Sequence, residues 1–178
     1  MKKIKTVYRI DRDLHRATEV VQEGWVLEGE GLATIKFDGT STMVLEGLLY
    51  KRYDAKGGKT PPVGFVPAEA APDIHTGHWP GWVRVSDTDP GDRWHREAFS
   101  DGAFEDGTYE LIGPKIQKNK YGLTRHKLVK HGSVTVAVGR SREELIGWLE
   151  ENEHEGLVFH HPDGRMAKLR RKDFSLRW

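Results

Sequence analysis

The strongest constraint on the fold of this chain is that its apolar runs are short and end at turn-forming residues. The 178 residues include 20 glycines and 8 prolines, which favour turns over long regular elements. The runs between them are rich in β-branched and aromatic side chains, as is typical of strands. Six tryptophans argue against disorder, because disordered chains are poor in aromatic residues. The pattern predicts an α+β protein with mostly antiparallel sheets and a few flanking helices.

One helix has a clear start. Ser141 and Glu144 have the spacing of a capping box, in which each side chain bonds to the backbone amide of the other residue. Leu145, Trp148 and Leu149 then share one face of the helix. Turns are predicted at residues 38–40 and, within a hairpin, at residues 161–164. Strands are predicted at residues 2–10, 32–37, 42–45, 48–53, 108–112, 134–138, 157–159 and 166–169.

The length of 178 residues corresponds to one domain. We therefore expect residues 1–178 to form a single domain, without a separate OB-fold domain. Residues 54–103 are rich in turns but contain Phe65, Trp79, Trp82 and Trp94. We interpret this stretch as an ordered aromatic insertion.

Several classes of protein are excluded by what the sequence lacks. The chain has no cysteine, which rules out disulfides, zinc–thiolate sites and cysteine nucleophiles. No apolar run approaches the ~18 residues of a membrane span. The basic residues 1–10 are not followed by the apolar stretch of a signal peptide. We expect a cytoplasmic protein with no membrane contact.

Positive charge is concentrated in two segments, although the net charge is only +1. Residues 113–131 contain six lysines and arginines and no acid, and residues 165–178 contain six against one aspartate. Such blocks in a nearly neutral chain predict a local site for a polyanion. The alternative is an ordinary solvated surface, which charge alone does not exclude.

A lysine at the end of a predicted strand is the first candidate for chemistry. Lys36 is followed by Phe37, Asp38 and Gly39 in a K-x-D-G pattern. A lysine placed before a turn can project its amine into a cleft, and the neutral amine is a nucleophile. By itself the pattern carries little weight, because it is expected by chance in ~4% of chains of this length.

Four further motifs follow Lys36 in order, and together they resemble the covalent nucleotidyltransferase superfamily of ATP-dependent ligases and capping enzymes. They are Lys51-Arg52-Tyr53, the run from Tyr109 to Lys115, Glu155-Gly156-Leu157-Val158-Phe159, and the run from Ala167 to Arg171. Residues 33–40, 49–53, 76–82, 107–115 and 168–174 are more closely similar to the 5′–3′ RNA ligase family that includes a vertebrate member.

This resemblance implies a nucleotidyltransferase (ligase adenylylation) fold and an ATP-dependent RNA ligase. Lys36 would take AMP from ATP and pass it to the 5′-phosphate of an RNA, and a 3′-hydroxyl would then displace the AMP. The implied metal is Mg²⁺, with Mn²⁺ as a substitute. The implied partner is RNA with 5′-phosphate and 3′-hydroxyl ends, and we expect a monomer.

The resemblance also assigns roles to individual residues. Lys168 and Arg170 alternate along one strand, so both can contact phosphates, although lysine is usual where Arg170 stands. Glu155 is the implied metal ligand, since Mg²⁺ prefers oxygen. The other implied nucleotide-binding residues are Asp38, Gly39, Arg52 and Glu110. RNA contacts are expected from Lys115, Lys118, Arg171 and Lys172, although Arg171 follows Arg170 and can point away from the site.

Several alternatives stay open at this level. Arg52 is alternatively a surface arginine paired with Asp54, and Glu110 by itself would be an exposed strand acid. The base has only the valines of residues 134–138 to pack against. The histidines and tryptophans of residues 54–103 pack into a core or form a stacking platform for RNA ends. The alternative functions are a GTP-dependent capping-type guanylyltransferase, a DNA ligase core and a catalytically degenerate RNA-binding protein.

Overall fold

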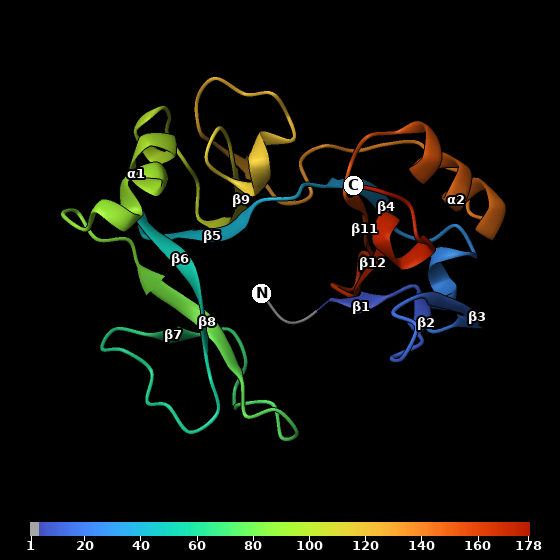
Figure 1. Ribbon diagram of the computed structural model, residues 1–178, viewed down its shortest axis with the longest axis horizontal. Helices are drawn as coiled ribbons and strands as arrows, with labels where there is room; N and C mark the ends of the chain where they lie inside the picture. The colour runs from blue at the N-terminus through green and yellow to red at the C-terminus, as the bar shows by residue number, and fades with distance from the viewer. Residues whose placement is uncertain (1–3) are drawn as a thin grey trace. The chain divides into compact units, whose positions relative to one another are not determined.

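The computed structural model describes residues 4–178, so Lys2 and Lys3 of the first predicted strand lie outside the described residues. The described chain forms two compact units (Figure 1). The middle unit comprises residues 38–131, and the terminal unit comprises residues 4–37 and 132–178. Each unit has its own sheet and its own apolar cluster. None of the helices within residues 4–178 is long and apolar enough to cross a membrane.

The terminal unit contains strands from both ends of the chain. Its elements are β1 (Lys5–Thr6), β2 (Tyr8–Ile10), β3 (Ala17–Val21), η1 (Gly24–Val26), β4 (Leu32–Lys36), α2 (Arg142–Glu151), β11 (Gly156–His160), β12 (Met166–Arg170) and η4 (Arg171–Phe174). The main sheet has the order β1-β12-β11-β4. β1 runs parallel to β12 and the other pairs are antiparallel, while β2 and β3 pair separately.

One face of this main sheet forms the core of the terminal unit. Side chains alternate between the two faces of a strand, and along β12 Ala167 and Leu169 are buried. They pack with Leu145 and Leu149 of α2. The helix begins as predicted, because Ser141 Oγ accepts from the Glu144 amide at 3.2 Å and Glu144 Oε2 accepts from the Ser141 amide at 2.9 Å. The opposite face of β12 carries Lys168 and Arg170.

The middle unit is built on a six-stranded antiparallel sheet. Its elements are β5 (Thr40–Leu45), β6 (Leu48–Ala55), β7 (Val66–Pro67), β8 (Trp79–Arg84), η2 (Pro90–Asp92), α1 (Arg93–Ser100), β9 (Gly107–Ile112), η3 (Gln117–Asn119) and β10 (Lys127–Lys130). The strand order is β10-β9-β5-β6-β8-β7. Val44, Leu49, Val85 and Tyr109 form its buried cluster. The predicted α+β class with mostly antiparallel sheets is confirmed.

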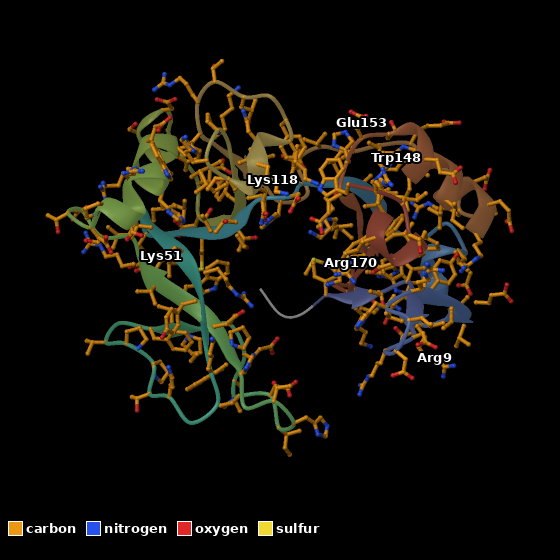
Figure 2. All side chains as sticks on the ribbon, in the orientation of Figure 1. Arg9, Lys51, Lys118, Trp148, Glu153 and Arg170 are labelled. Atoms are coloured by element: carbon orange, nitrogen blue, oxygen red, sulfur yellow. The ribbon has the colours of Figure 1, made fainter. Side chains whose placement is uncertain are left out.

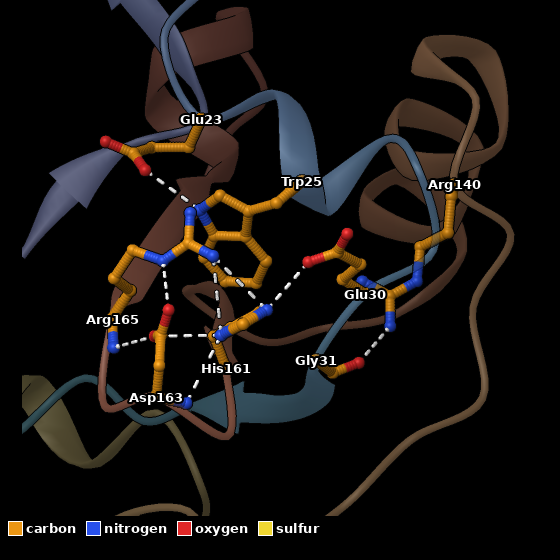
Figure 3. Close-up of polar contacts among 8 residues, drawn as sticks. All are labelled: Glu23, Trp25, Glu30, Gly31, Arg140, His161, Asp163 and Arg165. Carbon is orange, nitrogen blue, oxygen red and sulfur yellow. Dashed lines mark hydrogen bonds and ion pairs between the residues drawn. The ribbon is translucent and has the colours of Figure 1, made fainter.

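The hairpin that joins β11 and β12 is also confirmed, and side chains hold its turn (Figure 3). The Gly164 amide donates to the His161 carbonyl oxygen at 3.0 Å, which closes the turn. His161 Nε2 lies 2.7 Å from Glu30 Oε2, and Arg165 Nε donates to Asp163 Oδ2 at 2.7 Å. Hydrogen bonds from Arg165, the backbone amide first, lower the pKa of Asp163 to about 2. These contacts fix the register that aligns Lys168 and Arg170.

The prediction of a strand at residues 134–138 is wrong. Thr135 makes a single bridge to Thr34, and Val136 and Val138 pack against the core of the terminal unit. The segment bonds to β4 only around that bridge, through Val134 and Val136. Two valines that were candidates for contact with a nucleobase therefore pack against the apolar core.

The turn expected at residues 38–40 does not form, because Thr40 already begins β5. β4 pairs with β11 in the terminal unit, whereas β5 pairs with β6 and β9 in the middle unit. The residues after Lys36 thus carry the chain from one unit to the other. The first predicted strand is also divided, because the Val7 amide bonds to β12 while its carbonyl oxygen accepts from Gln22 and Glu23.

Aromatic side chains of residues 54–103 pack against one another within the middle unit. Trp82 is only 1% exposed. The ring centroids of Phe65 and Trp79 are 5.5 Å apart, and Trp94 stacks on His126 at 4.6 Å. This arrangement favours core packing over a stacking platform for RNA. The stretch also contains α1, a helix that was not placed from the sequence.

Candidate functional site

Strand pairing in the terminal unit brings together four of the predicted site residues. Lys36 at the end of β4 lies opposite Gly156 of β11, which lies opposite Arg170 of β12. Lys168 is two residues before Arg170, so the three basic side chains leave the same face of the sheet. Gly156 lies between Lys36 and Arg170 in this row, and the backbone of β12 leaves no room there for a larger residue.

Glu155 supplies the negative charge of this cluster. Its carboxylate forms an ion pair with the Lys36 ammonium. Both side chains are partly exposed, at 24% for Lys36 and 17% for Glu155. The Glu155 carbonyl oxygen accepts from the Arg171 amide at 2.9 Å, which anchors Glu155 to the end of β12. The Lys36 amine, a carboxylate and two further cations therefore share one partly exposed surface.

Lys168 has an altered proton affinity. Burial lowers the pKa of Lys168 to about 8, and the nearby charges of Arg170 and Lys36 act in the same direction. Asp173 and Glu155 oppose this effect. Near neutral pH the side chain is a partly desolvated cation, and such a cation gains more from an incoming phosphate than a solvated one does.

The stability of the protein should therefore depend on the charge of Lys168. Below about pH 8 the lysine is protonated in both folded and unfolded chains, and the folded state bears the cost of burying the charge. Between about pH 8 and the ordinary value of 10.5 the unfolded chain binds more protons, so this contribution to stability rises with pH. Lys168→Met should abolish that rise. Urea unfolding at about pH 7 and about pH 9.5 measures it, and an identical pH dependence in both proteins would contradict this assignment.

Arg170 is oriented by an aspartate that the sequence analysis did not select. Its Nε and Nη2 atoms donate to the two carboxylate oxygens of Asp173 at 2.9 and 2.7 Å. The Asp173 side chain is only 5% exposed. This two-point contact uses one edge of the guanidinium and holds Arg170 on the site face, at the end of β12 (Figure 2).

The two basic residues after Arg170 differ from each other. Arg171 donates to the carbonyl oxygens of Leu149 and Asn152 at the end of α2, and to that of Arg177. Its guanidinium thus stabilises a helix C-terminus. Lys172 is exposed. The structure gives Arg171 a structural role, as its position next to Arg170 suggested, and the RNA contacts of both residues stay predictions.

The remaining predicted residues belong to the middle unit. The Asp38 amide donates to Tyr121 Oη at 2.7 Å, and the Asp38 carboxylate is 4.0 Å from Lys120 Nζ. A Cβ atom on Gly39 would clash with the carbonyl oxygen of Leu111, so only glycine fits there. β9 and the loop after it therefore hold Asp38 and Gly39 in place.

Arg52 forms the ion pair that was the alternative to a nucleotide contact. Its Nε atom lies 3.1 Å from Asp54 Oδ1, and its guanidinium lies over the Trp82 ring at 5.3 Å. The neighbouring Lys51 is 2.5 Å from the buried Asp92. Arg52 has 25% of its side chain exposed, and its nucleotide contact stays a prediction.

Glu110 lies on β9 with 13% of its side chain exposed, and its Oε2 atom is 2.9 Å from His131 Nε2. It is thus neither fully exposed nor unpaired. Lys115 and Lys118 are exposed on the segment that follows β9, and Figure 2 labels Lys118. Lys118 lies within η3 and has a positive φ of 59°, so this short element departs from regular helical geometry.

The residues of the terminal unit fit a metal bound mainly by its substrate. No group of three His, Asp or Glu side chains within residues 4–178 is arranged to hold a metal ion. Glu155 offers one carboxylate among cations. Mg²⁺ commonly binds through one or two carboxylates together with substrate phosphates and water, and Glu155 meets that requirement.

Three residues that the sequence analysis missed contact predicted ones. Asp173 orients Arg170, Tyr121 holds the Asp38 amide, and His131 bonds to Glu110. Asp173 follows Arg170 at a spacing of three, which is a usable signal. Tyr121 and His131 gave no local signal, because they meet their partners through the fold.

Comparison with known proteins shows which family this chain is similar to. Residues 101–178 match the model of the RNA ligase 1 family. The chain is 30% identical to RNA ligase 1 of Danio rerio over 142 residues, which are 60% of this chain and 43% of that protein. It is 26% identical to RNA ligase 1 of Pongo abelii over 162 residues, 67% of this chain and 50% of that protein. This chain is thus similar in sequence to the RNA ligase 1 proteins.

The predicted resemblance to the RNA ligase family is confirmed. The chain spans about half the length of these RNA ligase 1 relatives, since the matches cover 43% and 50% of them. The segment that matches the family model contains Glu110, Glu155, Lys168 and Arg170, whereas Lys36 precedes it.

Proposed function

We propose that this chain is an ATP-dependent RNA ligase of the nucleotidyltransferase fold, working through a lysyl-AMP intermediate. The observation that carries the proposal is the position of Lys36 on one sheet face with Lys168 and Arg170, beside the Glu155 carboxylate. A reactive amine next to two cations suits attack on a phosphate. The family relationship supports RNA as the nucleic acid that is joined.

The first step forms a covalent adduct on Lys36. The neutral Nζ atom attacks the α-phosphorus of ATP, an N–P bond forms, and the bond to the leaving pyrophosphate breaks. Lys168 and Arg170 are placed to neutralise phosphate charge during this transfer. Mg²⁺, or Mn²⁺ in its place, would be held by Glu155 and would neutralise further phosphate charge when bound.

The later steps join the RNA ends. The AMP moves from Lys36 to an RNA 5′-phosphate, and an RNA 3′-hydroxyl then attacks that phosphate and releases AMP. Asp38, Gly39, Arg52 and Glu110 are the proposed nucleotide contacts of the middle unit. The exposed lysines Lys115, Lys118 and Lys172 are the proposed contacts to the RNA backbone, together with any remaining donor of Arg171.

Labelling with radioactive ATP tests the proposal. Incubation with ATP labelled at the α-phosphate and Mg²⁺ should give a labelled protein that survives denaturation, and excess EDTA should prevent it. A nicked or open RNA with 5′-phosphate and 3′-hydroxyl ends should then discharge the label and be joined, while the matching DNA should not. Stronger labelling by GTP would indicate a capping-type enzyme, and joining of DNA would indicate a DNA ligase core. RNA binding without any adduct would indicate a degenerate RNA-binding protein.

A further inference from the structure

His131 of the middle unit lies between two polar side chains of β9. Its Nδ1 atom is 2.9 Å from Thr108 Oγ1, and its Nε2 atom is 2.9 Å from Glu110 Oε2. The His131 amide also donates to the Thr108 carbonyl oxygen at 3.0 Å. Both ring nitrogens are therefore engaged, and the ring cannot rotate without breaking a hydrogen bond.

The strand register explains how these three residues meet. β10 ends at Lys130, which is opposite Tyr109, so His131 comes next and lies opposite Thr108. Thr108 and Glu110 are two residues apart on β9 and share one face of the sheet. The imidazole spans the space between them along this face.

The chemistry of the contacts assigns the protons. A carboxylate can only accept, so in the neutral ring Nε2 carries the proton and donates to Glu110. Nδ1 then accepts from the Thr108 hydroxyl. This arrangement occupies one oxygen of Glu110 and limits rotation about the terminal torsion of the glutamate, which is otherwise broad. The second oxygen is thereby held in a defined direction.

The strand on the other side of Glu110 carries an unsatisfied hydroxyl. Ser41 of β5 is directly opposite Glu110. Its Oγ atom is buried and has no hydrogen-bond partner within residues 4–178. Buried polar atoms are nearly always bonded, so this hydroxyl is an exception, and it does not occupy the second oxygen of Glu110.

We infer that His131 is a positioning residue that orients Glu110 for recognition of a ribose hydroxyl of the nucleotide. The inference rests on the proposed function, in which Glu110 contacts the nucleotide. His131 acts through Glu110, which presents its second oxygen as the acceptor for the ribose. A hydroxyl recognised in this way discriminates against a nucleotide that lacks it, because the carboxylate is then left without its partner.

Two substitutions separate the two contacts of the ring. Glutamine can place its amide nitrogen near the position of Nε2, so His131→Gln keeps the bond to Glu110. Asparagine reaches only the position of Nδ1, so His131→Asn keeps the contact with Thr108 and loses Glu110. Calorimetry should measure Kd values for ATP, 2′-deoxyATP and 3′-deoxyATP, and labelling should give KM and kcat for ATP.

The wild-type protein should prefer ATP to one of the two deoxynucleotides. His131→Asn should lower that preference about fivefold and raise KM, with kcat within about twofold, and His131→Gln should restore the preference. In a Glu110→Gln background, His131→Asn should have no further effect, because its influence passes through the carboxylate. Thr108→Val removes the hydroxyl that bonds to the ring but keeps Glu110, so it should lower the preference for ATP about twofold. This variant serves as the test if His131→Asn does not fold.

Several results would overturn the inference. They are a wild-type protein that binds all three nucleotides equally, an unchanged preference in His131→Asn, and equal effects of His131→Asn with and without the Glu110 carboxylate. Failure of the proposed function gives a different result. The protein would then still prefer ATP to a deoxynucleotide in Kd but would form no covalent label. A protein that binds no ATP would refute both.

Discussion

Replacing Lys36 by methionine should abolish the labelled adduct, with a loss of at least about a thousandfold in adenylylation. Methionine has no nitrogen that can form a bond to phosphorus, and none of the residues paired with Lys36 across the sheet supplies a second lysine at that position. The measurement is the amount of label retained by denatured protein after incubation with ATP and Mg²⁺.

Lys36→Arg is the matched control for charge. Arginine keeps a cation beside Glu155, yet it stays protonated and is not a nucleophile at accessible pH. It should therefore unfold at nearly the same urea concentration as the wild-type protein and still form no adduct. Label retained in either variant would show that another residue carries the AMP, whereas loss of label in an exposed variant such as Lys56→Met would point to a nonspecific effect.

Replacing Gly156 by alanine should destabilise the terminal unit strongly. An added Cβ atom would clash with the carbonyl oxygen of Leu169 and lie 2.9 Å from Arg170 Cα. Both atoms are backbone in a paired strand, so neither can move without disturbing the sheet. Overpacking of this kind costs about 1–3 kcal/mol or more in the free energy of unfolding, and urea unfolding measures it.

Gly156→Ala should slow labelling by more than its loss of folded protein explains. Gly156 joins Glu155 to β11 and lies between Lys36 and Arg170, so a shift of the strand displaces three groups of the candidate site. The folded fraction of Gly156→Ala should therefore label more slowly than wild-type protein at the same concentration of folded molecules.

Gly147→Ala is the matched control for this substitution. Gly147 lies inside α2, and nothing is within 4 Å of a Cβ atom built there. Alanine should stabilise the helix by about 0.5–1 kcal/mol, because glycine is a poor helix former. Both alanine variants could instead unfold at the same urea concentration as the wild-type protein. Close packing at Gly156 would then not explain a lower labelling rate of Gly156→Ala.

Local patterns in the sequence predicted several elements well. The capping box of Ser141 and Glu144 and the hairpin at residues 161–164 both depend on residues within a few positions of each other. The alternation of Lys168 and Arg170 with buried neighbours is a property of any strand. In each case the interaction that forms the structure joins residues that are close together in the chain.

Predictions failed where the partner of a segment was distant in the chain. Residues 134–138 have the composition of a strand, but Val136 and Val138 pack against the core, and only Thr135 bridges to β4. The helix α1 was missed although Asp89 and Pro90 mark its approach. Its sequence from Arg93 to Ser100 is mostly polar, and its packing within the middle unit was not visible in the local pattern.

The sequence by itself determined the chemistry available to this protein. The order of the motifs from Lys36 to Arg170 indicated the resemblance to RNA ligases and named a candidate nucleophile, an acid and two cations. Only the tertiary structure decided how these groups are held. The pairing of β4, β11 and β12 placed Lys36 and Arg170 in one row, and the pairing of β9 and β10 brought His131 to Glu110. Motif order is a property of the chain alone, whereas register between distant strands depends on which faces are buried together.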